Sequence, residues 1–221
     1  MLGVGDKYVG VRALLPPVWR TLPWRVLGAA GGLGPVLAGA GRLMPRAGGT
    51  THGLMVLRTG ALALALGLAF LLDDPARHTT AVVPTRRVVR TGLRMALVAP
   101  LAALSWTAAL LLVPGEMRPP VGAVTLEVAT LIALALTGAM AAVRFTDEPR
   151  PGGAVTVSLL AGTVFALLLP GRWELFSEVD ASDWAAAHQR WAALLTLTLP
   201  VGAALLPEPI RRYRARAWAH R

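Results

Sequence analysis

Six apolar blocks separated by short polar segments organise this chain of 221 residues. The blocks cover residues 26–44, 54–72, 95–113, 121–143, 154–170 and 191–206. Each is about as long as a helix that crosses the ~30 Å hydrocarbon core of a bilayer. The connecting segments are too short to form a soluble domain. The pattern predicts an all-α, polytopic membrane helix bundle with about six transmembrane helices.

The same pattern divides the chain into three parts. Residues 1–25 are basic and amphipathic and are expected to lie in the headgroup layer on the cytoplasmic side. Residues 26–206 form the six-span transmembrane domain, and residues 207–221 form a basic cytoplasmic tail. The first block is the weakest of the six, because glycine dilutes it. Within that block, Gly28 and Gly32 are four residues apart, and Gly34, Gly39 and Gly41 follow; small residues of this kind favour close helix packing.

Positive charge accumulates on alternate connections. Sixteen of the 22 lysine and arginine residues fall within 1–25, 73–94, 144–153 and 207–221, and the net charge of +10 is that of these segments. The opposite connections balance five arginines with five acids. An excess of lysine and arginine marks the cytoplasmic face, so both termini are predicted inside. Anionic lipid headgroups explain this basic surface better than nucleic acid does.

The segment after the second block has the composition of a docking surface. Asp74 followed by Pro75 is a helix-start pattern and predicts a short helix over residues 75–82. Thr85 is then expected to cap the next helix, which would carry Arg86, Arg90 and Arg94 on one basic face at i, i+4 and i+8. A capped helix held between two spans can transmit force to them, whereas the alternative is a basic turn that only contacts lipid. Near the other face, Ser182 is expected to cap a last helix that begins near Asp183.

Two ionisable residues lie within the apolar blocks. Arg58 and Glu127 are predicted roughly 6 and 9 Å below the outer boundary, at 1.5 Å per helical residue. Intramembrane charges are costly, so we predict that the two residues pair or line one outward cavity. The alternative is that each reaches the outer interface separately. Four further polar residues could line a pathway or simply support packing: Ser105, Trp106, Thr130 and Thr137.

Enzyme signatures are absent from the sequence. The chain has no cysteine, and its only lysine, Lys7, does not follow the glycine pattern of a phosphate-binding loop. The four histidines fall in different segments without a metal-binding spacing. Asp73, Asp74 and Arg77 faintly resemble a phosphotransferase motif, but the further aspartates needed for metal ions are missing. We expect no enzyme activity, no metal and no cofactor in this chain.

The arrangement resembles the membrane subunits of ATP-binding-cassette exporters of the type-2 permease class. Those subunits have six spans, both ends inside, an amphipathic helix before the first span and a coupling helix in the first inside loop. The run LDDPARHTTAVVPT is similar to a recurring loop sequence of small bacterial members. The arginine-rich, alanine-rich composition is also typical of a GC-rich bacterial genome, which places the protein in a bacterial plasma membrane.

The resemblance implies partners and a direction of transport. A separate cytoplasmic subunit would bind ATP and magnesium, and a second permease subunit, identical or related, would complete the pathway. An amphiphilic small molecule or peptide would move outward. The residues implied to contact the ATPase lie in the first inside loop: Asp73, Asp74, Pro75, Arg77, His78, Thr79 and Thr80.

Two other functions remain open. A non-catalytic scaffold or accessory subunit of a larger membrane complex would also present a basic docking face. An ion-driven transporter would favour charges near mid-membrane and an internal repeat, and the sequence offers neither convincingly.

Overall fold

The computed structural model describes residues 15–16, 18–43, 49–73, 87–146 and 150–206. These residues form helices and turns, and no strand occurs among them. Each of the six apolar blocks corresponds to one helix of 16 to 26 residues. The six helices are α2 (Trp24–Gly41), α3 (Gly49–Ala69), α4 (Arg87–Leu112), α5 (Val121–Phe145), α6 (Gly152–Leu167) and α7 (Trp184–Leu205).

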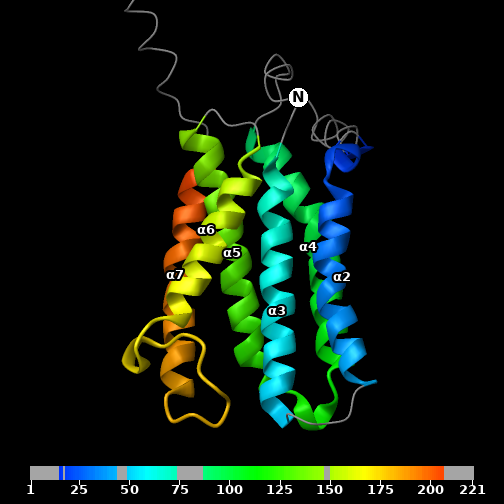
Figure 1. Cartoon of the computed structure of the whole chain (residues 1–221). Helices are drawn as coiled ribbons and strands as arrows, with labels where there is room; N and C mark the ends of the chain where they lie inside the picture. Colours follow the sequence, from blue (N-terminus) through cyan, green and yellow to red (C-terminus); the bar gives the residue numbers. More distant parts are fainter. Residues whose placement is uncertain (1–14, 17, 44–48, 74–86, 147–149, 207–221) are drawn as a thin grey trace, which may run out of the picture.

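The helices run up and down in one bundle, with α2 beginning and α7 ending at the same end (Figure 1). Short 3-10 turns occur at Phe70–Leu72, Gly115–Met117 and Gly171–Trp173. Helix α3 lies at the centre and packs against α2 and α5, while α5 also packs against α7. We call the end where α2 begins the basic end, because the four arginine-rich segments of the sequence connect there.

Three helical stretches are long and apolar enough to cross a membrane. They are Gly49–Leu72, Val88–Leu112 and Val121–Phe145, of 24, 25 and 25 residues. The helix Gly152–Leu167 is apolar but shorter. Large apolar side chains also face outward, including Phe165 and Leu197, each 67 % exposed. Many exposed large apolar side chains are expected on a protein that is embedded in a membrane.

Glycine packing in α2 differs from the prediction. A Cβ at Gly28 or Gly32 would meet nothing within 4 Å, so this pair makes no close helix contact among the described residues. Gly34 instead crosses Gly60 of α3, where a Cβ on Gly60 would lie 2.8 Å from the Gly34 Cα. The prediction that the glycines of this block allow close helix packing is therefore confirmed at Gly34, while Gly28 and Gly32 make no such contact.

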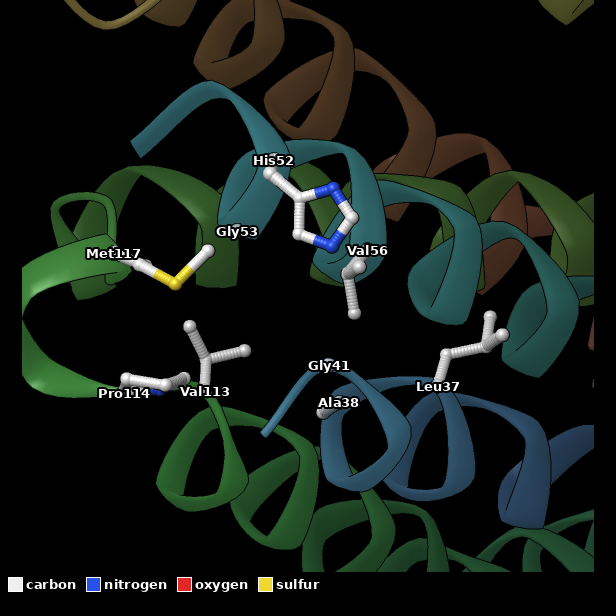
Figure 2. Close-up of a pocket in the computed structure, with 9 residues that line it drawn as sticks. All are labelled: Leu37, Ala38, Gly41, His52, Gly53, Val56, Val113, Pro114 and Met117. Carbon is white, nitrogen blue, oxygen red and sulfur yellow. The ribbon is translucent and has the colours of Figure 1, made fainter. Parts of the chain in front are cut away.

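A second close approach occurs at the opposite end of the bundle (Figure 2). Gly53 of α3 lies directly against the 3-10 turn Gly115–Met117, and Met117 is buried there. The cavity between α3, this turn and the end of α2 is only about 10 Å³, roughly the space of a single water molecule. The absence of a side chain at Gly53 therefore lets the turn between α4 and α5 pack onto α3.

Two predicted helix starts have different outcomes. Helix α7 begins at Trp184 as expected, but Ser182 does not cap it. Asp183 occupies the N-cap position, and its backbone carbonyl accepts from the Ala187 N–H at 2.8 Å. The short helix predicted over 75–82 and its neighbour Thr85 lie outside the described residues.

Part of the N-terminal segment is described. Val18 and Leu22 are buried against the bundle, while Trp19 is 48 % exposed. The rings of Trp19 and Trp24 lie 4.2 Å apart, and the Trp24 indole N–H donates to the Trp19 carbonyl. This portion has one apolar side against the helices and one aromatic side facing outward.

Candidate functional site

Arg58 and Glu127 form an ion pair inside the bundle, as predicted from their matching depths. Arg58 Nε donates to Glu127 Oε2 at 2.9 Å, and Arg58 Nη2 donates to Glu127 Oε1 at 2.7 Å. The Glu127 side chain is 2 % exposed and that of Arg58 is 9 % exposed. This two-point contact joins α3 to α5 and lets each charge neutralise the other away from water.

His188 of α7 lies beside this ion pair, and we call Arg58, Glu127 and His188 the charge cluster. Its Nε2 lies 3.2 Å from Glu127 Oε1, without the alignment of a hydrogen bond. Its Nδ1 lies 2.8 Å from the Trp184 carbonyl oxygen, which can only accept. The ring hydrogen is therefore assigned to Nδ1, and a second proton on Nε2 would face the carboxylate. Sequence reasoning did not link His188 with Glu127, because that link depends on the rotation of α7.

Residues 168–183, which connect α6 to α7, fold over the charge cluster, and we call them the covering segment. The Arg58 guanidinium lies 5.3 Å from the centre of the Phe176 ring, within cation–π range. Phe176 in turn makes an edge-to-face contact with Trp191, at 5.4 Å between ring centres. The Trp191 indole donates to the Leu175 carbonyl at 2.8 Å. Phe176 thus covers the ion pair, and α7 holds it in place.

Arg190 fixes the start of the same covering segment. Its guanidinium donates to the carbonyls of Glu174 and Arg172, each at 2.7 Å. Ser177 is only 1 % exposed, although it lies in a connection between helices. The charge cluster and its contact with Phe176 therefore connect α3, α5, α7 and the covering segment.

Among the described residues, no group of three or more His, Cys, Asp or Glu side chains could hold a metal ion.

The other predicted intramembrane polar residues lie at helix contacts. The Ser105 hydroxyl of α4 donates to the Gly31 carbonyl of α2. The Trp106 indole donates to the Thr125 hydroxyl of α5 at 3.2 Å. The Thr130 hydroxyl lies 2.8 Å from the Leu126 carbonyl oxygen of its own helix and 3.3 Å from the Trp191 carbonyl oxygen of α7, and its single hydrogen is shared between these two acceptors. These hydrogen bonds are those expected of helix packing in a membrane.

Thr137 occupies a different type of contact. It lies on α5 opposite Gly202 of α7, where an added Cβ would come within 2.8 Å of the Thr137 hydroxyl. The threonine therefore fits a close crossing of the two helices.

At the basic end, Asp73 and Arg94 fix the point where the chain leaves α3. Arg94 of α4 is 5 % exposed, and its Nη1 donates to the carbonyls of Leu71 and Asp73, both at 3.3 Å. Its Nη2 donates to the Thr21 hydroxyl at 3.4 Å. The Asp73 carboxylate accepts from the Gly152 N–H at the start of α6, at 2.8 Å. We call Asp73, Arg94 and these partners the α3–α4 junction.

The junction includes one of the residues predicted to contact an ATPase. Asp73 is described, and its carboxylate binds the first turn of α6. The remaining members of that predicted set lie outside the described residues: Asp74, Pro75, Arg77, His78, Thr79 and Thr80. Arg94 was predicted only as part of a basic helix face, since the sequence gives no sign that its head group points inward.

Comparison with known proteins found no relative of this chain. No protein-family model matches the chain, and neither the curated proteins nor the solved structures yield a match.

Proposed function

We propose that this chain is the membrane-spanning permease subunit of an ATP-binding-cassette exporter in a bacterial plasma membrane. In this proposal all six helices cross the bilayer and the basic end faces the cytoplasm. The exported substrate is an amphiphilic small molecule or peptide. ATP and magnesium bind to a separate subunit, because this chain lacks the glycine–lysine phosphate loop of a nucleotide-binding protein. A second permease subunit completes the pathway.

The α3–α4 junction is the observation that supports this proposal most. Residues 74–86 connect two points that are both held firmly: Asp73 is bound to α6, and Arg94 joins α4 to the end of α3. A cytoplasmic partner that moved residues 74–86 would therefore pull on α4 and α6 together. Such a connection suits a subunit whose helices are moved by ATP hydrolysis in a neighbouring protein.

Copurification tests the proposal. A tagged full-length chain, extracted from its native membrane, should bring down an ATP-hydrolysing subunit whose activity falls when Thr79→Pro breaks the predicted docking helix. A scaffold would instead bring down other membrane proteins, with no dependence on nucleotide. That second result would overturn the exporter proposal.

The junction itself makes a sharper prediction. Arg94→Gln removes the charged donor that holds the carbonyls of Leu71 and Asp73, so it should retain ATPase binding but lose most of the stimulated hydrolysis. Arg25→Gln is the matched control, because Arg25 is an exposed arginine at the same end of the bundle. ATP turnover of the purified complex in vesicles measures both. Equal turnover in the two variants would show that the junction does not transmit force.

A further inference from the structure

His188 lies between two hydrogen-bond acceptors of the bundle. Its Nδ1 is 2.8 Å from the Trp184 carbonyl oxygen, and its Nε2 is 3.2 Å from Glu127 Oε1. A neutral imidazole carries a single N–H group, so it can donate to only one of these oxygens. Nε2 is buried and has no hydrogen-bond partner among the described residues. The ring therefore satisfies both of its neighbours only when both nitrogens carry a hydrogen.

Glu127 has the acceptor capacity for a further N–H group. A carboxylate offers about four lone-pair sites, and Arg58 uses one on each oxygen. His188 Nε2 approaches the oxygen that Arg58 Nη2 also contacts, Oε1. After a small rotation of the ring, an Nε2–H group would donate a charge-assisted hydrogen bond from α7 to α5. Arg58 would keep both of its bonds to the same carboxylate.

The immediate surroundings of His188 accommodate one more positive charge. Arg58 of α3 and Glu127 of α5 are the charged groups that face the ring across the charge cluster, and their opposite charges cancel. The Trp184 ring packs against the His188 ring, with 4.1 Å between ring centres. Cations are attracted to the faces of aromatic rings. A protonated His188 is therefore stabilised by a carboxylate and an aromatic ring, against repulsion from Arg58.

The other charged groups around the start of α7 are mainly acidic. Arg190, on α7 itself, is bonded to two carbonyls of the covering segment. The His188 side chain is 11 % exposed and lies near the end of the bundle opposite the basic end, so a proton can reach it from water there. The covering segment has one arginine against four acids, and within the described ranges none of them pairs with His188: Arg172, Glu174, Glu178, Asp180 and Asp183.

We propose that the charge cluster is a proton-binding site. A proton taken up from water converts His188 to the imidazolium form, whose Nε2–H donates to Glu127 Oε1 while Nδ1–H keeps the Trp184 carbonyl. Release of the proton removes the bond between α7 and α5. Ionisable side chains inside membrane helices commonly mark proton sites. The inference depends on the geometry of the cluster alone, so it holds whether or not the chain belongs to an exporter.

Solid-state NMR of the full-length chain in vesicles tests the protonation directly. Histidine rings are labelled with 15N and glutamate carboxyls with 13C, and the His188 signals are those lost in His188→Gln. We expect both ring nitrogens to carry hydrogen at about pH 5.5, with Nε2–H in contact with a carboxylate, and Nε2 to be bare at about pH 8. A bare Nε2 at the lower pH, a protonated ring without the carboxylate contact, or a ring protonated at both pH values would overturn the proposal.

Thermal unfolding in detergent tests whether the proton strengthens the bundle. In the unfolded chain His188 meets only water, so the added bond stabilises the folded state while the proton is bound and is lost as the pH rises. The midpoint of the parent relative to His188→Gln should therefore increase by roughly 3–10 °C from about pH 8 to about pH 5.5. His188→Asn replaces His188→Gln if the latter does not fold.

His52→Gln is the matched control, because His52 is an exposed histidine of α3 at the same end of the bundle. Its midpoint relative to the parent should be the same at both pH values. A difference between the parent and His188→Gln that does not change with pH, or one that changes equally for His52→Gln, would show that the cluster binds no stabilising proton.

Discussion

Replacing Glu127 with alanine is expected to leave little folded protein after extraction into mild detergent. Arg58 would remain inside the bundle without its carboxylate partner, and removing one member of a buried ion pair costs about 3–5 kcal/mol. Arg58→Ala should have a similar effect, because Glu127 is 1 % exposed and would be left inside the bundle without its two hydrogen-bond donors from Arg58. The fraction of monodisperse protein in size-exclusion chromatography after a heating series measures the loss.

Paired substitutions provide the control for this prediction. A buried ion pair is often no more stable than apolar residues of similar volume, so Arg58→Met combined with Glu127→Met should recover most of the folded protein. The exchanged pair, Arg58→Glu with Glu127→Arg, should also exceed either single charge reversal. Single variants as stable as the parent, or double variants no better than the singles, would show that the contact between α3 and α5 is unimportant.

Gly53→Ala is expected to destabilise the opposite end of the bundle. An added Cβ would lie 2.0 Å from the Met117 carbonyl oxygen and 3.3 Å from Val113 Cγ1. The obstructing atom belongs to the backbone of the 3-10 turn seen in Figure 2, so no side-chain rotation relieves the clash. Overpacking of this kind costs about 1–3 kcal/mol, and the midpoint of thermal unfolding in detergent should fall accordingly.

Gly39→Ala is the matched control, since it makes the same change inside another helix. A Cβ at Gly39 would meet nothing within 4 Å. Alanine is favoured over glycine by about 1 kcal/mol in a helix interior, so this variant should be unchanged or slightly more stable. If Gly53→Ala unfolds at the same temperature as Gly39→Ala, the close contact at Met117 is wrong.

The sequence was most informative where a pattern extended over many residues. Long apolar runs identified the helices α2 to α7, because apolar segments of this length favour a helix, in which the backbone hydrogen bonds are satisfied within the segment. Matching depth also predicted the contact between Arg58 and Glu127, since two costly charges at one level gain from pairing. Neither inference required knowledge of how each helix is rotated about its axis.

The predictions were incomplete where a contact depends on how a helix is rotated about its own axis. His188 joins the charge cluster only because of the way α7 turns toward α5, and Arg94 turns inward although its neighbours suggest a basic face. The sequence indicated five glycines in α2 for close packing, and Gly34 is the one that crosses Gly60 of α3. Several glycines fall within a few residues of each other in this helix, so spacing alone does not select the face that packs.

Cysteine accessibility tests the membrane orientation most directly. The chain has no cysteine, so single variants Thr79→Cys and Ser182→Cys each carry one reactive thiol on opposite connections of the bundle. With a membrane-impermeant maleimide on intact cells, we predict that Ser182→Cys is labelled and that Thr79→Cys reacts only after permeabilisation. Labelling of Thr79→Cys from outside, with Ser182→Cys protected, would reverse the orientation and contradict the proposed docking of a cytoplasmic ATPase.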